Sequence, residues 1–408
     1  MSNISRRQFL KMGGGLAAAS IAGGMIPQLA FAAPGSYRGD TLISVFLRGG
    51  ADTLNLVVPY GDPAYYANRT SIAIPAPRVG QAGTALNLDG FFGFHPAAAP
   101  LRTLFQQKTL AVIQAAGSPD PSRSHFDQQD YLESGTPGVP FQGSGWIGRH
   151  LQSIGITAET FTAVGLSAHT QKSLRGSIPP LGFNRLSSFR VTGGSSVEQA
   201  LRSMYSGSNS LAVAATQTLN AQSVAAALSA TPYQPANNAV YPNNSFGVQM
   251  ANIAQLIRSD VGLAAACVDL GGWDTHTNEG GVTGTFANNV STLANALSAL
   301  STDLGNRMGQ VTVVVMTEFG RRVKENASGG TDHGHGSAML AMGGNILGGK
   351  VYGTWPGLGA ASLDQGDLAV TTDFRNVLGE IVLKRLGNSR LDQVFPGFSV
   401  KSLGLAIG

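Results

Sequence analysis

Short apolar segments alternating with helix-like stretches are the feature that most constrains the fold of this chain. Six apolar runs end in Gly or a polar residue, which is typical of buried strands. These runs cover residues 41–47, 110–115, 161–166, 263–270, 311–316 and 338–342. Helix-like stretches cover residues 101–107, 196–205, 246–258, 286–304 and 373–386. The alternation predicts an α/β fold of the doubly wound, three-layer α/β/α kind, with a mostly parallel central sheet.

The first 32 residues have the character of an export signal. Arg6 and Arg7 precede a weakly apolar Gly/Ala-rich stretch over residues 12–29, which is followed by Ala30-Phe31-Ala32. This order is typical of a twin-arginine signal peptide cleaved after Ala32. The many glycines disfavour a membrane helix in this stretch. We therefore expect a periplasmic or secreted protein that meets the twin-arginine translocase during export.

The mature chain, residues 33–408, is expected to form a single α/β domain. Residues 193–244 are rich in Ala, Ser and Asn and lack clear strands, so they predict a helical insertion. No later stretch reaches the roughly 18–20 consecutive apolar residues that cross a bilayer, so we expect no stable membrane span.

Charge and cysteine content exclude several classes of protein. The chain has 27 Lys and Arg against 23 Asp and Glu. Three of these bases and no acid lie in the signal, so the mature net charge is only +1. We therefore expect no nucleic-acid partner. Cys267 is the single cysteine, which excludes a disulfide framework and a multi-thiolate metal site.

Polar clusters stand at the ends of several predicted strands. Residues 48–53, 271–276 and 317–322 follow three of them, and residues 330–336 precede the last. The carboxyl ends of parallel strands share one edge of a sheet, where ligands bind in such folds. These clusters are therefore expected to converge on one site.

The composition of these clusters favours a metal centre. Asp274 and His276 are two residues apart, and Asp332, His333 and His335 place three ligand-capable groups in four residues. Carboxylate oxygens together with imidazole nitrogens suit zinc, manganese or iron. An isolated Asp-X-His would more simply be a surface turn, but the clusters together favour metal.

Ser124 and His125 supply a hydroxyl group beside an imidazole. A serine next to a metal can act as a nucleophile without a triad base. The alternative is that Ser124 caps the N-terminus of a helix. Both interpretations remain open from the sequence. The remaining histidines, His95, His150 and His169, are expected to be structural.

The identity and order of these polar clusters along the chain resemble those of the alkaline phosphatase and sulfatase superfamily. The chain looks more closely like a family of twin-arginine-exported bacterial proteins of unknown function that is assigned to that superfamily. The closer resemblance covers nearly all of the mature chain. It rests on Phe46-Leu47-Arg48-Gly49-Gly50-Ala51-Asp52, Ser124-His125-Phe126, Gly272-Trp273-Asp274-Thr275-His276, Thr317-Glu318-Phe319-Gly320-Arg321 and Gly330-Thr331-Asp332-His333-Gly334.

The resemblance to alkaline phosphatases implies roles for individual residues. Asp52 matches a metal-binding aspartate that ends the first strand, and Ser124 falls where the nucleophile is expected. Asp274 and His276 look like the pair that binds the first metal, although the phosphatase spacing is wider.

The resemblance leaves two registers open for the remaining ligands. One places Glu318 and Phe319 on a second Asp-His pair, so that a histidine ligand is missing. The other places Asp332 and His333 on that pair and leaves His335 for the late ligand. A formylglycine sulfatase is disfavoured, because Cys267 and the serines lack the Cys/Ser-X-Pro-X-Arg motif.

These observations predict an exported metal-dependent hydrolase of phosphate or sulfate esters. Its substrate would be a small-molecule or polymer ester, attacked by Ser124 or by a metal-bound water, with His125 beside the nucleophile and Arg321 binding the anion. One or two divalent ions, zinc or manganese, would bind among Asp52, Asp274, His276, Glu318, Asp332, His333 and His335. The alternative is a non-catalytic, metal-stabilised periplasmic binding or envelope-assembly protein of the same fold.

Overall fold

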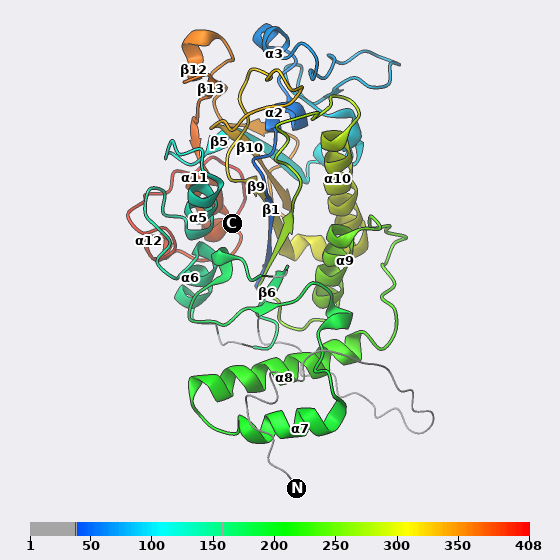
Figure 1. Ribbon diagram of the computed structural model, residues 1–408, viewed down its shortest axis with the longest axis vertical. Helices are drawn as coiled ribbons and strands as arrows, with labels where there is room; N and C mark the ends of the chain where they lie inside the picture. The colour runs from blue at the N-terminus through cyan, green and yellow to red at the C-terminus, as the bar shows by residue number, and fades with distance from the viewer. Residues whose placement is uncertain (1–36, 38, 157–158, 168) are drawn as a thin grey trace.

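A nine-stranded sheet forms the centre of the described part of the chain (Figure 1). The computed structural model describes residues 37, 39–156, 159–167 and 169–408, so the predicted export signal lies outside the described residues. The strands of the sheet are β1 (Thr41–Leu47), β5 (Leu110–Gly117), β6 (Ala163–Leu166), β7 (Leu181–Gly182), β8 (Ala265–Leu270), β9 (Val311–Thr317), β10 (Ser337–Gly343), β11 (Val351–Tyr352) and β14 (Thr372–Asp373).

The order of the strands is β11-β5-β10-β9-β1-β8-β6-β7, with β14 also paired to β5. All pairs are parallel except those of β10, which runs antiparallel to β5 and β9. Because β10 runs against its neighbours, the loop that enters it lies at the edge where the other strands end. Two smaller sheets are formed by β2 (Val57–Val58), β3 (Leu86–Asn87) and β4 (Gly93–Phe94), and by β12 (Leu363–Asp364) and β13 (Asp367–Leu368).

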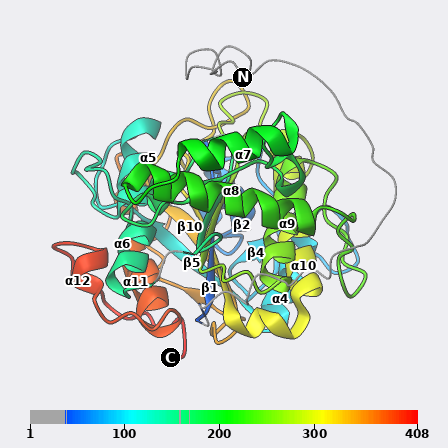
Figure 2. The same ribbon diagram turned by 90° about the horizontal axis from the view of Figure 1, so that it is seen from below.

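Helices cover both faces of the sheet (Figures 1 and 2). One face packs against α4 (Ala99–Gln106), α9 (Ser245–Arg258) and α10 (Thr285–Leu304). The other packs against α5 (His125–Ser134), α6 (Trp146–Ser153), α11 (Phe374–Lys384) and α12 (Leu391–Val394). The remaining helices are α2 (Thr53–Leu56), α3 (Pro63–Asn68), α7 (Gly194–Met204) and α8 (Ser210–Leu228).

Alternation along the central strands divides the core between these two helical layers. Val313 and Val315 of β9 face the layer of α9 and α10, whereas Val314 and Met316 face the layer of α11. Successive side chains of a strand point to opposite faces, so a strand covered on both sides must be apolar throughout. This requirement explains the continuous apolar runs in the sequence.

The predicted doubly wound α/β/α architecture is confirmed, and each of the six apolar runs contains a strand of the main sheet. Two helices on one face, α5 and α6, were not predicted. The sequence of α5 mixes polar and apolar residues without a helical period, so only its N-cap, Ser124, signals it. Helix α6 is amphipathic but spans only eight residues, Trp146–Ser153, which is shorter than the windows in which such a period stands out.

Helices α7 and α8 lie within residues 193–244, beyond the end of the sheet at which β1 begins (Figure 1). We propose that this segment is an insertion into the single domain expected from the sequence. Across the described residues, the structure contains no helix of the length and apolarity needed to span a membrane.

Candidate metal centre

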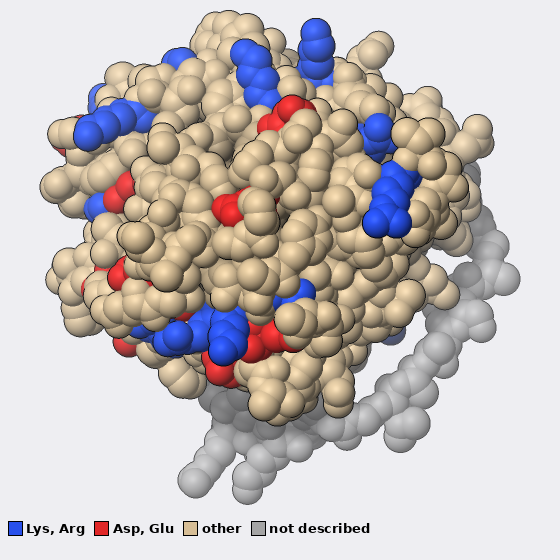
Figure 3. All heavy atoms as spheres, turned by 90° about the horizontal axis from the view of Figure 1, so that it is seen from above, with Lys and Arg blue, Asp and Glu red and all other residues tan. Residues whose placement is uncertain are grey.

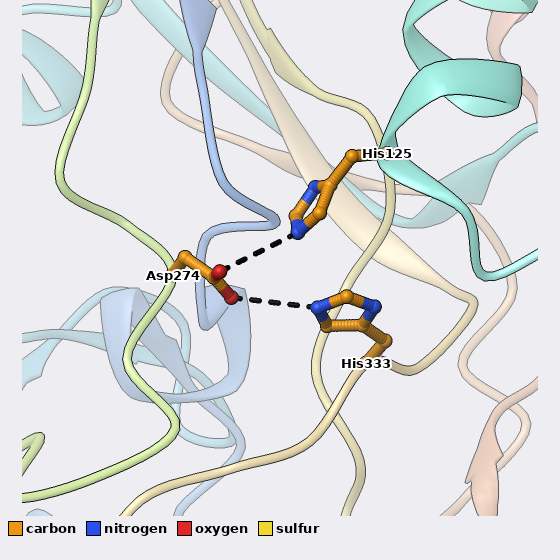
Figure 4. Close-up of side chains that lie close together, drawn as sticks. All are labelled: His125, Asp274 and His333. Carbon is orange, nitrogen blue, oxygen red and sulfur yellow. Dashed lines mark ion pairs between the residues drawn. The ribbon is translucent and has the colours of Figure 1, made fainter.

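Three segments distant in sequence bring histidine and aspartate side chains together at the carboxyl edge of the sheet. His125 is the first residue of α5, Asp274 lies in the loop after β8, and His333 lies in the loop between β9 and β10. One ligand-type atom from each of these residues lies within 4.8 Å of the others (Figure 4). Figure 3 looks onto this face from above and shows acidic side chains exposed near its middle.

His276 joins the three residues from the more exposed side. Its Nε2 atom lies 3.1 Å from Oδ1 of Asp274 and 3.0 Å from Nε2 of His333. Nε2 of His333 is 3.4 Å from Asp274 Oδ1, and Nε2 of His125 is 3.6 Å from Asp274 Oδ2. We call His125, Asp274, His276 and His333 the His–Asp cluster.

The outer ring nitrogen of each histidine in the cluster faces an acceptor. Nδ1 of His125 lies 2.8 Å from Oε1 of Glu318, and Nδ1 of His276 lies 3.1 Å from Oδ1 of Asp332. Nδ1 of His333 lies 2.9 Å from the carbonyl oxygen of Arg123. Carboxylate and carbonyl oxygens only accept, so each Nδ1 carries the proton and donates it.

This arrangement directs three Nε2 lone pairs towards Asp274. Nε2 of His125 is buried and has no hydrogen-bond partner among the described residues. The Nε2 atoms of His276 and His333 face each other as two acceptors, an unfavourable contact for neutral rings without a cation between or beside them. Zinc–nitrogen bonds of about 2.0–2.1 Å place two bound nitrogens roughly 3–3.5 Å apart. The residues therefore fit a divalent ion.

Glycines allow the loops that carry the cluster to approach closely. Gly50 has φ of +63°, and a Cβ there would lie 2.4 Å from the ring of Phe319. The Phe319 ring in turn packs 4.8 Å from the rings of both His125 and His333. A Cβ on Gly330 would lie 2.4 Å from the carbonyl oxygen of Thr275. Larger residues at these positions would separate the segments that bear the cluster.

Arg321 holds Asp274 in place from beneath the cluster. Its buried guanidinium donates to Oδ1 of Asp274 at 2.5 Å and to the carbonyl oxygens of Gly49, Gly50, Trp273 and Thr331. The donors point at these internal acceptors, and we propose that Arg321 positions Asp274 instead of binding the anion, the role expected from the sequence. Burial raises the pKa of Asp274, but the hydrogen bond and charge of Arg321 outweigh it and lower that pKa.

The groups around the histidines favour ionised carboxylates at Glu318 and Asp332 and shift the pKa values of His125 and His333 in opposite directions. Burial opposes ionisation of Glu318, but hydrogen bonds from His125 and Gln129 lower its pKa to about 2. The hydrogen bond to Glu318 raises the pKa of His125, whereas burial lowers the pKa of His333. Hydrogen bonds from Asn326 and His276 lower the pKa of Asp332. Glu318 and Asp332 thus orient the rings and are not themselves in the cluster.

Three other expected site residues lie outside the cluster. Both carboxylate oxygens of Asp52 accept hydrogen bonds from Arg69. Both ring nitrogens of His335 face acceptors, Asp364 Oδ2 at 2.7 Å and the Ser118 carbonyl at 2.9 Å. Ser124 is the N-cap of α5, where its Oγ accepts from the backbone N–H of Asp127 at 3.3 Å. Asp52 and His335 are therefore left out of the metal centre proposed below.

The sequence did not predict one charged residue at this edge of the sheet, Arg69. Arg69 follows α3 with no ligand-type residue beside it, so nothing in the sequence signals its pairing with Asp52. His125 was among the expected site residues, beside a nucleophile, and we propose below that it is a ligand.

The His–Asp cluster lies outside the carboxyl ends of the strands, which is where α/β proteins of this kind bind their ligands. The chain belongs to the family described as "Protein of unknown function (DUF1501)", which it matches over residues 109–376. Residues 3–23 match the twin-arginine translocation pathway signal sequence. The protein is therefore exported by that pathway and is periplasmic or secreted. No curated protein matches the chain.

Several solved structures are distantly similar to the chain. The PsFucS1 sulfatase from Pseudoalteromonas sp. is 11% identical, with 91% of this chain and 74% of that chain covered and a TM-score of 0.41. The alkaline phosphatase from the Antarctic bacterium TAB5 is 11% identical, with 77% and 95% covered and a TM-score of 0.31. The C-terminal periplasmic domain of EcEptC from Escherichia coli, in complex with Zn, is 9% identical, with 76% and 74% covered and a TM-score of 0.35.

Proposed function

We propose that this protein is an exported, metal-dependent hydrolase of phosphate or sulfate esters. The observation that carries the proposal is the convergence of three Nε2 atoms on the Asp274 carboxylate, while every Nδ1 is held by an acceptor. Metal-binding histidines in proteins donate their second ring nitrogen in this way, which fixes the tautomer and the ring orientation. Imidazole with carboxylate favours zinc or manganese.

A divalent ion held by His125, Asp274, His276 and His333 would supply Lewis-acid stabilisation of charge on an ester oxygen and lower the pKa of a coordinated hydroxyl group. The protein's own residues perform the supporting tasks. Glu318 and Asp332 orient two imidazole rings, the Arg123 carbonyl orients the third, and Arg321 fixes the Asp274 carboxylate. The buried Phe319 ring packs against the rings of both His125 and His333.

Two groups are candidates for the attacking oxygen. Ser124 precedes the ligand His125 and carries a hydroxyl group at the N-terminus of α5. The capping hydrogen bond uses its oxygen as an acceptor, which leaves the hydroxyl proton free to be donated. A water molecule is the alternative, and the two are separated by the Ser124 variant described in the Discussion.

A second candidate function is a non-catalytic, metal-stabilised periplasmic binding or envelope-assembly protein. The engagement of Arg321 with internal acceptors favours it, because the residue expected to bind the anion is not free to do so. In this case the ion would contribute stability without turnover.

The test begins with metal analysis of the mature protein purified from the periplasm. We expect bound zinc or manganese in the parent protein and in the His169→Ala control, whose histidine is exposed, but not in His333→Ala. The metal-loaded protein is then assayed against a panel of phosphate and sulfate esters. Hydrolysis that is lost in His333→Ala supports the hydrolase, and bound metal without hydrolysis of any ester supports the second candidate. Absence of metal from the parent protein contradicts both.

A further inference from the structure

Asp52, Arg69 and Glu279 form a second group of charged side chains at the same edge of the sheet. Asp52 directly precedes α2, Arg69 follows α3, and Glu279 lies in the loop that leads from His276 to α10. The side chains of Asp52 and Arg69 are 0% exposed, and Glu279 is also 0% exposed. We call these three residues the Arg69 cluster.

The guanidinium of Arg69 uses all five of its donors within the protein. Nη2 donates to Oδ1 of Asp52 at 2.8 Å, and Nη1 donates to Oδ2 of the same carboxylate. The remaining hydrogen bonds go to Oδ1 of Asn55 at 2.8 Å and to the carbonyl oxygens of Val323 at 3.1 Å and Arg322 at 3.2 Å. Arginine stays protonated in proteins, so Asp52 faces a permanent cation.

Glu279 brings no second negative charge to this cluster. Burial and the neighbouring Asp52 raise its pKa well above the ordinary value. Its Oε2 atom accepts from the Thr331 hydroxyl at 2.8 Å, while the buried Oε1 atom has no donor among the described residues. A carboxylate oxygen buried without a donor is costly, whereas a protonated carboxyl group there can donate to Asp52. Asp52, Arg69 and Glu279 together then carry no net charge.

An ion bound to Asp52 would have to displace Arg69 or lie beside its positive charge. Both oxygens of Asp52 are already engaged, and Glu279 offers no free carboxylate to offset a second cation. The residues at Asp52 therefore do not fit a metal ion, although Asp52 was expected as a ligand from the sequence.

We propose that the Arg69 guanidinium stands in place of a second cation, so that the protein binds one metal ion per chain, at the His–Asp cluster alone. The inference rests on the proposed function in that it requires the His–Asp cluster to bind metal. It adds the number of ions and assigns Asp52 to structure instead of ligation. Arg69 is accordingly a positioning residue for the loops beside the site, through the Val323 and Arg322 carbonyls.

The experiment is a count of ions per chain on the full mature protein, titrated with Mn²⁺ alone. Calorimetry and elemental analysis of the dialysed protein are expected to give one ion, with the electron paramagnetic resonance spectrum of an isolated Mn²⁺. Two ions per chain, or a spin-coupled pair, would overturn the inference and leave the proposed metal function standing. No bound ion would overturn the proposed function and, with it, the count of one.

Variants of Asp52 and Asp274 distinguish the roles of the two residues by Mn²⁺ binding, without a measurement of activity. Asp52→Asn is expected to keep one ion per chain, whereas the matched Asp274→Asn is expected to weaken Mn²⁺ binding at least tenfold. Equal loss of Mn²⁺ binding in both variants would identify Asp52 as a ligand and contradict the inference. If Asp52→Asn fails to fold, the ion count and the spectrum of the parent protein decide the question.

Discussion

Two aspartates lie in the segments that follow neighbouring strands at the same edge of the sheet, and each accepts hydrogen bonds from a buried arginine, yet their surroundings differ. Asp274 meets Arg321 through one oxygen, and its side chain is 48% exposed, so the carboxylate also faces three imidazole rings. Asp52 meets Arg69 through both oxygens and is completely buried. The position of a carboxylate at a strand end therefore does not decide whether it can bind a ligand. These two aspartates differ in burial and in the number of oxygens that the neighbouring arginine engages.

The largest effect of any variant is expected at the cluster around Asp274, on metal-dependent activity. Replacing His333 by Ala removes one of the nitrogens that face Asp274, so hydrolysis of the best ester should fall by about three orders of magnitude or more. Bound metal should fall in parallel, as measured by elemental analysis. His169→Ala is the control and should match the parent protein. Unchanged metal and turnover in His333→Ala would remove the His–Asp cluster as the site.

Stability should be affected most at Asp52. Asp52→Asn leaves the buried Arg69 guanidinium without its counter-ion, a change that typically costs about 3–5 kcal/mol. Chemical denaturation of the parent protein and the variant measures this cost. Asp274→Asn should cost less, because its side chain is half exposed. A smaller loss of unfolding free energy in Asp52→Asn than in Asp274→Asn would contradict this prediction.

The pH dependence of unfolding sharpens the description of the Arg69 cluster. Because the pKa of Glu279 is raised in the folded state, the native protein binds a proton that the unfolded chain releases above about pH 4.5. That contribution to stability is present below pH 4.5 and is lost as pH rises towards the folded pKa. Glu279→Gln has no such proton, so its free energy of unfolding relative to the parent protein should increase between pH 5 and pH 8.

The control for this measurement is Glu198→Gln. Glu198 is a partly exposed residue of α7 that forms an ion pair with Arg202. Its substitution should leave the slope of stability against pH unchanged. A Glu279→Gln protein whose relative stability is flat across this range would show that Glu279 is ionised in the folded protein.

The smallest effect is expected at Ser124. Loss of its cap on α5 should cost about 1 kcal/mol. Asn209→Ala removes a comparable cap from α8, where Oδ1 of Asn209 accepts from the N–H of Ala212 at 2.9 Å, far along the chain from the cluster. If Ser124 is the nucleophile, only Ser124→Ala lowers turnover by orders of magnitude. Parental turnover in a stable Ser124→Ala protein would eliminate Ser124 as the attacking group.

The layered fold could be predicted from the sequence because strands buried on both faces must be apolar throughout. The antiparallel direction of β10 could not be predicted from the sequence. Ser337–Gly343 is buried on both faces, as are the strands of the sheet that run parallel to one another. The convergence of Asp274, His276 and His333 followed from their place at strand ends. The pairing of Arg69 with Asp52 did not, because it depends on the path of the chain after α3 and not on any local pattern.

The antiparallel direction of β10 has a consequence for the order in which the site is assembled. The loop between β9 and β10 joins adjacent strands and carries both Arg321 and His333, which pair in an isolated β-bridge, so this part of the site needs only that strand pair. His125 and Asp274 come from other parts of the chain and reach the loop only when the long-range pairing of β1, β5 and β8 is complete. If the His–Asp cluster binds metal as proposed, metal binding would therefore require the complete sheet and would report that the long-range strand pairs have formed.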